Sequence, residues 1–116
     1  MARQIEIHNP EEIENLPAEL QKSNSNLLIF KFSPYCPVSH RVENMFDKWI
    51  SKVNDDLYYI KINVITERSI SKAVAEKFNI QHESPQALFV LPAGKVKWNA
   101  SHYDITETAL NKLIIN

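Results

Sequence analysis

The chain has 116 residues, of which 44% are apolar and 23% are charged, a length that fits one domain with a single hydrophobic core. Its 13 basic and 14 acidic side chains nearly cancel, which argues against a nucleic-acid-binding protein because phosphate contacts require a basic face. The longest apolar run, Ala87–Leu91, is too short to span a membrane, and the single cysteine cannot form an internal disulfide, so we expect a cytoplasmic protein.

The first third of the chain predicts a strand, a helix and a second strand. A short β-like stretch at Gln4–His8 precedes Asn9 and Pro10, which suit the N-cap and the first turn of a helix. We expect Pro17 to kink this helix or to divide it into two pieces, because proline has no backbone N–H. The mostly apolar segment Leu27–Ser33 predicts a strand that is buried on both faces, as in a parallel sheet.

The middle of the chain predicts two helices with a strand between them. Apolar residues recur at helical spacing over Pro37–Ile50, and Leu57–Asn63 predicts the next strand. A second amphipathic helix is expected from residue 66 or 67 to about residue 78. Asn79 follows it and suits the left-handed conformation that often ends a helix.

The last third predicts a hairpin and a final helix. Gln86–Leu91 predicts a strand, the turn at Pro92–Gly94 contains the only glycine, and Lys95–Asn99 alternates like a half-exposed edge strand. Thr106 is the expected cap of the last helix. The order β-α-β-α-β-α-β-β-α requires parallel pairing first and an antiparallel hairpin last. We therefore predict an α/β fold with a mixed sheet of four or five strands and helices on both faces.

The single cysteine is the strongest candidate for a reactive group. Cys36 lies between the predicted buried strand and the helix that opens with Pro37. At that position backbone N–H groups and the positive end of the helix dipole stabilise a thiolate, which is the nucleophile of disulfide exchange. A buried, inert cysteine is the alternative, but a turn rich in serine and proline is a poor place for a core residue. We therefore predict that Cys36 is reactive.

Two residues near Cys36 bear on its chemistry. Ser39 stands where a C-x-x-C motif has its second cysteine, and its hydroxyl can hydrogen-bond the thiolate but cannot release a mixed disulfide, so an outside thiol must do so. His40 could add positive charge near the sulfur or carry a proton. The alternative is a metal site that also uses His82 and His102. Metal-binding sequences usually have their ligands in closely spaced pairs, and these residues are scattered along the chain, so we favour a site without metal.

A cysteine at a strand-to-helix junction, together with a proline at the head of a C-terminal hairpin, resembles thioredoxin. The resemblance covers nearly the whole chain. It implies a single thioredoxin-like domain over residues 1–116, with a cis Ser84–Pro85 bond beside Cys36. It also implies that the backbone of residue 84 pairs with the chain that carries the incoming disulfide.

Three motifs give a closer resemblance, to the monothiol bacilliredoxins of the YtxJ-like family. They are Cys36-Pro37-Val38-Ser39, His82-Glu83-Ser84-Pro85-Gln86 and Trp98-Asn99-Ala100-Ser101-His102. That family is bacterial and cytoplasmic, and the resemblance implies removal of bacillithiol from protein mixed disulfides. Cys36 would take the bacillithiol group, and a second bacillithiol or another redox protein would regenerate it, with no bound cofactor.

The same resemblance suggests which residues form the site. Beside the nucleophile and Ser39, substrate contacts are expected from Tyr35, Pro37, Ser84 and Pro85. Three further residues flank the cis-proline loop: His82, Glu83 and Gln86. They would shape the rim of the site, or they would only be solvated by water and cap the strand. The sequence departs from the family pattern at Phe32, which is commonly His, and at Tyr35, which is commonly small and polar. Both flank the nucleophile, so they bear on substrate preference.

The sequence leaves other functions open. A non-catalytic thioredoxin-like module would use the cis-proline groove to hold partners without turnover, and its thiol would alkylate slowly at pH 6. Iron–sulfur carriage, as in monothiol glutaredoxins, fits less well because those proteins have Gly where this chain has Pro37. A peroxidatic cysteine is suggested only by Ser33, three residues before Cys36.

Overall fold

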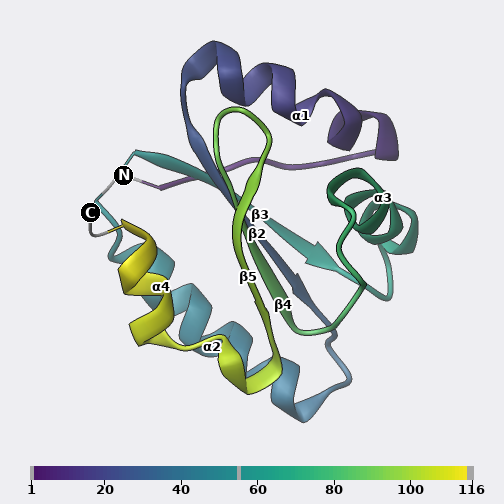
Figure 1. Ribbon diagram of the computed structural model, residues 1–116. Helices are drawn as coiled ribbons and strands as arrows, with labels where there is room; N and C mark the ends of the chain where they lie inside the picture. Colours follow the sequence, from purple (N-terminus) through teal and green to yellow (C-terminus); the bar gives the residue numbers. More distant parts are fainter. Residues whose placement is uncertain (1, 55, 115–116) are drawn as a thin grey trace.

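The computed structural model describes residues 2–54 and 56–114. Its elements follow the predicted order, with one short 3-10 helix (η1) added before the last helix (Figure 1). In chain order they are β1 (Arg3–Gln4), α1 (Pro10–Ser23), β2 (Asn26–Phe32), α2 (Pro37–Ser51), β3 (Leu57–Asn63), α3 (Arg68–Phe78), β4 (Gln86–Val90), β5 (Val96–Ser101), η1 (His102–Asp104) and α4 (Glu107–Ile114).

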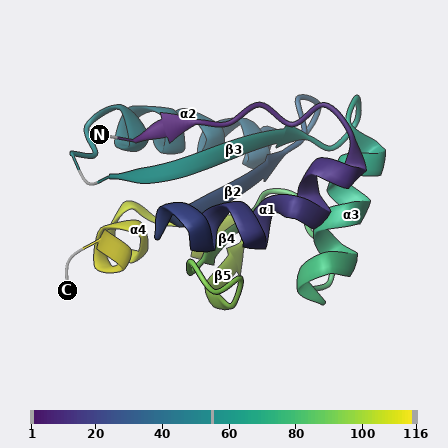
Figure 2. The ribbon, with the colours of Figure 1, turned by 90° about the horizontal axis from the view of Figure 1, so that it is seen from above.

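The strands form one five-stranded sheet in the order β1-β3-β2-β4-β5, which is visible from β3 to β5 in Figure 2. β3 pairs in parallel with β1 and β2, whereas β4 pairs antiparallel with β2 and β5. Helices α1 and α3 pack on one face, and α2 and α4 pack on the other. The predicted mixed α/β sheet with helices on both faces is confirmed.

The central strand β2 divides the core between the two faces. Leu27 and Ile29 pack with α1 and α3, and Leu28 and Phe30 pack with α2 and α4. Successive side chains of a strand point to opposite faces, so an apolar run in the central strand serves both layers. This arrangement explains why apolar and polar residues do not alternate along β2.

Helix α1 differs from the prediction at Pro17. The helix is continuous across this proline rather than divided in two. Ile13, Leu16 and Leu20 are buried on both sides of Pro17 and pack as one stripe on the sheet. Proline in a helix interior costs roughly 3 kcal/mol, and this shared burial outweighs that cost because each buried aliphatic side chain contributes about 1.5–3 kcal/mol.

Several predicted helix caps are present. Asn9 Oδ1 accepts a hydrogen bond from the Glu12 N–H at 3.1 Å, and Thr106 Oγ1 accepts from the Ala109 N–H at 3.1 Å. Asn79 ends α3 in the left-handed conformation with φ 53°. These caps satisfy backbone groups that a helix leaves unpaired, which is why polar residues at these positions were informative in the sequence.

The predicted strand ends shift by a few residues. β1 is only two residues long, although the Ile5 N–H continues the pairing to the Tyr59 carbonyl at 2.8 Å. β5 continues to Ser101, two residues beyond the predicted end, because Gln86 and Ala87 of β4 provide partners for it. No helix in the described residues is both long and apolar enough to cross a membrane.

Candidate active site

Cys36 is the N-cap residue of α2, with Pro37 at the first helical position. It is a free, partly exposed cysteine in extended backbone conformation, and its side chain makes no capping hydrogen bond. Its own N–H donates to the Ser33 carbonyl at 3.3 Å, which closes the turn between β2 and α2. The sulfur therefore lies at the positive end of a 15-residue helix, where an anion is favoured.

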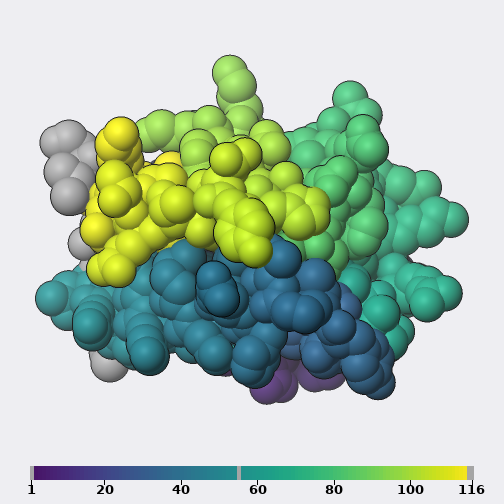
Figure 3. Space-filling view, turned by 90° about the horizontal axis from the view of Figure 1, so that it is seen from below, coloured from purple at the N-terminus to yellow at the C-terminus, as the bar shows by residue number. Residues whose placement is uncertain are grey.

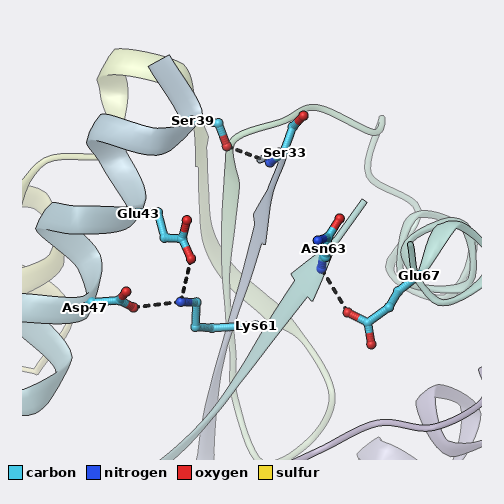
Figure 4. A network of polar contacts seen from close by, with 7 residues as sticks. All are labelled: Ser33, Ser39, Glu43, Asp47, Lys61, Asn63 and Glu67. Carbon is cyan, nitrogen blue, oxygen red and sulfur yellow. Dashed lines mark hydrogen bonds and ion pairs between the residues drawn. The ribbon is translucent and has the colours of Figure 1, made fainter. Parts of the chain in front are cut away.

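Ser39 is fully buried, and its hydroxyl supports this turn. Ser39 Oγ accepts a hydrogen bond from the Ser33 N–H at 2.7 Å, as Figure 4 shows. The bond ties the first turn of α2 to the residue that follows β2. The hydroxyl proton of Ser39 is not used in this bond, because the oxygen acts as the acceptor.

The loop before β4 meets the active-site turn at the same edge of the sheet. The Ser84–Pro85 peptide bond is cis, and Gln86 at the start of β4 pairs with Lys31 near the end of β2. The Pro85 carbonyl accepts from the His102 N–H at 3.0 Å, which fixes the loop from its other side. The hydroxyl of Ser84 is buried and has no hydrogen-bond partner within the described residues.

Large exposed apolar side chains follow three strands that end at this edge of the sheet. Tyr35 is 80% exposed directly before the cysteine, Ile65 follows β3, and Tyr103 is 65% exposed in η1 after β5. The carboxyl ends of β2, β3 and β5 all lie at one edge, since β5 runs antiparallel to β4 and β4 runs antiparallel to β2. Figure 3 shows the face on which α2 and the C-terminal segment with η1 and α4 lie side by side.

The other predicted site residues have separate roles. Pro37 and His40 are exposed on the first turn of α2, and the Glu83 carboxylate lies 3.9 Å from His102 Nδ1. Gln86 is buried, and its Nε2 donates to the Gln81 carbonyl at 2.9 Å. In the described parts of the chain, no three His, Cys, Asp or Glu side chains lie close enough to hold a metal ion.

A buried lysine cluster was not predicted from the sequence. Lys31 is fully buried in β2, its Nζ donates to the Ser71 carbonyl at 2.9 Å, and the same Nζ lies 3.3 Å from His82 Nδ1. Burial lowers the pKa of Lys31 to about 8. Partial burial of the His82 ring lowers its pKa, the Lys31 charge lowers it further, and Glu83 opposes both effects. The signal available in the sequence was one charged residue inside an otherwise apolar strand.

A second lysine connects α2 to the sheet. Lys61 Nζ on β3 donates to Glu43 Oε2 at 2.7 Å and to Asp47 Oδ1 at 2.9 Å (Figure 4), and it lies 5.1 Å from the ring centre of Phe32. Burial alone would lower the pKa of Lys61, but the hydrogen bonds and negative charges of Glu43 and Asp47 outweigh it and raise the pKa. The network holds α2, and with it Cys36, against the strands.

The family model for monothiol bacilliredoxin BrxC matches residues 5–110, which include every residue of the proposed site. The chain belongs to the monothiol bacilliredoxin family. The match agrees with the resemblance that the cysteine and cis-proline motifs gave. It supports a redox role as a thioredoxin-like thiol oxidoreductase.

Solved structures similar to this bacilliredoxin-family chain have the thioredoxin fold. One, described as a proposed oxidoreductase with a thioredoxin fold, is 29% identical, with a TM-score of 0.74 over 94% of this chain and 91% of the other. Thioredoxin NaTrxh from Nicotiana alata is 18% identical, with a TM-score of 0.72 over 98% and 91%. Reduced Schistosoma mansoni thioredoxin pre-protein is 16% identical, with a TM-score of 0.70 over 97% and 95%. The thioredoxin-like fold prediction is confirmed.

Proposed function

We propose that this chain removes bacillithiol, or a similar low-molecular-weight thiol, from protein mixed disulfides through Cys36. The observation that carries the proposal is a free, partly exposed cysteine at the N-cap of α2 with a serine three residues later. A thiolate is stabilised there, and no second thiol of the chain competes for the mixed disulfide. Membership of the bacilliredoxin family supports the same reaction.

The reaction consists of two thiol–disulfide exchanges. The Cys36 thiolate attacks the bacillithiol sulfur of the substrate disulfide, a new Cys36–bacillithiol disulfide forms, and the protein thiolate leaves and takes a proton from water. A second bacillithiol thiolate, or a thiol of a reducing partner protein, then attacks this mixed disulfide. That step releases oxidised bacillithiol or a mixed disulfide with the partner, and it restores the Cys36 thiolate. The chemistry requires an external thiol and therefore suits a reducing cytoplasm.

The neighbouring residues would position the substrate. Ser39 would donate its hydroxyl proton to the thiolate, and Tyr35 and Pro37 would contact the incoming chain. Ser84 would pair through its backbone with the substrate strand beside Pro85. A buried hydroxyl without a partner costs free energy, so the unpaired Ser84 hydroxyl also fits a role in contacting substrate.

The exposed apolar residues at this edge suit protein substrates. Tyr35, Ile65 and Tyr103 follow the carboxyl ends of three strands, and an exposed tyrosine offers a partner both an apolar ring and a hydroxyl. A protein that carries a mixed disulfide would cover them while its sulfur approaches Cys36. S-thiolated proteins are therefore the proposed partners.

Intact-mass measurement after incubation with oxidised bacillithiol tests the proposal. We expect one bacillithiol adduct on the wild-type chain, which disappears on addition of reduced bacillithiol. The Cys36→Ser variant serves as the matched control and should carry no adduct. Absence of the adduct from the wild type, combined with slow alkylation of Cys36 at pH 6, would instead support a non-catalytic binding module.

A further inference from the structure

A surface pocket of about 440 Å³ lies beside α3 at the edge of the sheet that carries Cys36. Its lining includes no acidic residue and consists of Val64, Ile65, Arg68, Ser71, Lys72 and His82. The Val64 N–H donates to the Phe32 carbonyl at 2.9 Å, and Phe32 ends β2 four residues before Cys36. The pocket and the nucleophile therefore flank the same end of β2.

The pocket has an excess of positive charge. Arg68 and Lys72 are exposed one helical turn apart on α3, and neither forms an ion pair with any residue that the structure describes. The negative group that acts on His82 is Glu83, whose Oε1 lies 3.9 Å from His102 Nδ1. Two unpaired basic side chains at a pocket mouth favour an anionic ligand.

A buried cation lies beneath this pocket. The Lys31 ammonium contacts two lining residues, the carbonyl of Ser71 at 2.9 Å and Nδ1 of His82 at 3.3 Å. Both acceptors are neutral, and no carboxylate is among the contacts of Lys31 Nζ within the described chain. A buried charge without an opposite charge costs free energy, and an anion bound in the pocket would reduce that cost.

The contact with Lys31 also determines which nitrogen of His82 can serve a ligand. An ammonium group only donates, so His82 Nδ1 accepts and the neutral ring carries its proton on Nε2. The Ser71 hydroxyl lies 3.2 Å from the same Nδ1 and holds the ring in place. His82 therefore offers an Nε2–H donor beside Arg68 and Lys72.

We propose that this pocket binds the carboxylate end of the low-molecular-weight thiol that exchanges at Cys36. In bacillithiol this end is the malyl group, which carries two carboxylates and lies away from the sulfur. Arg68 and Lys72 pair with the carboxylates, and the Nε2–H of His82 donates to one of them. This inference rests on the proposed function and adds a reason for preferring anionic thiols.

Binding of malate to the Cys36→Ser variant tests the pocket without using the thiol. We expect malate to move the ring signals of His82 in a saturable NMR titration, and the uncharged diamide of malate to leave them in place. Replacing both pocket cations, Arg68→Gln with Lys72→Gln, should weaken malate binding roughly tenfold or more. The matched control, Lys95→Gln with Lys97→Gln, removes the same charge at the opposite end of the sheet and should change binding less than about twofold. An unmoved His82 signal, or equal weakening in both pairs, would overturn the proposal.

Kinetics separate the pocket from the reaction itself. With Cys36 intact, the variant lacking both pocket cations should form the adduct with oxidised bacillithiol more slowly but react normally with neutral 2-hydroxyethyl disulfide. An equal effect on both disulfides, or none on either, would contradict the pocket assignment. If wild-type Cys36 reacts with neither disulfide, the proposed function fails, whereas the malate titration still decides whether the pocket binds carboxylates.

Discussion

Replacing Lys31 with methionine should stabilise the protein at neutral pH. The pKa of about 8, against an ordinary value of 10.5, means that burial disfavours the charged form by roughly 3 kcal/mol, at ~1.36 kcal/mol for each pH unit. Lys31→Met removes this cost and fills the same volume with an unbranched apolar chain. It also removes the hydrogen bond to the Ser71 carbonyl, a loss of about 1 kcal/mol. We expect a net gain of about 2 kcal/mol at pH 7.

The pH dependence of this gain has a defined sign. Below pH 8 Lys31 is charged in both the folded and the unfolded chain, so the wild type bears the full cost of burial. Between about pH 8 and 10.5 the folded protein releases its proton before the unfolded chain does, and the stability of the wild type rises relative to the variant. The advantage of Lys31→Met should therefore shrink over this range, reach zero at about pH 9.5 and reverse by pH 10.5, where the hydrogen bond to the Ser71 carbonyl favours the wild type.

Urea unfolding at pH 7, 9 and 10 measures this difference, and Lys61→Met is the matched control. The raised pKa of Lys61 means that its charge stabilises the fold below pH 10.5, so Lys61→Met should lose about 1 kcal/mol at pH 7 rather than gain. A Lys31→Met protein that is less stable than the wild type at pH 7 would refute the reasoning. So would a stability difference that stays constant from pH 7 to pH 10.

Two other substitutions test the turns of the fold. Ser39→Ala removes the acceptor 2.7 Å from the Ser33 N–H, so the free energy of unfolding in urea should fall by about 1–2 kcal/mol. Formation of the bacillithiol adduct at Cys36 should also become slower. Unchanged stability would show that water replaces the hydroxyl. Gly94→Ala places a Cβ 3.0 Å from Pro17 Cβ, at a residue whose φ is +87°. Thermal unfolding should therefore show a loss of stability of at least about 1 kcal/mol. An unshifted Tm would mean that α1 moves freely away from the turn.

Local patterns in the sequence were sufficient to predict most of the fold. The apolar run of β2, the helical stripe after Pro37 and the caps at Asn9, Asn79 and Thr106 depend on periodicity and on backbone groups within a few residues. The predicted division of α1 at Pro17 was wrong, because the cost of a proline is local while the burial that offsets it comes from the sheet.

The position of Cys36 was also a local property, since a strand, a turn and Pro37 place it at a helix start. What the sequence could not indicate is which residues far apart in the chain meet at that edge. Lys31 and His82 are 51 residues apart, and Lys61 and Glu43 are 18 apart, yet their side chains are in contact. Lys31 contacts neutral acceptors and Lys61 contacts carboxylates, so the charge of Lys31 lowers the stability of the fold and the charge of Lys61 raises it. The sequence by itself determined the elements and the nucleophile, and only the tertiary packing decided which charges are balanced, because that balance depends on neighbours brought together by the sheet.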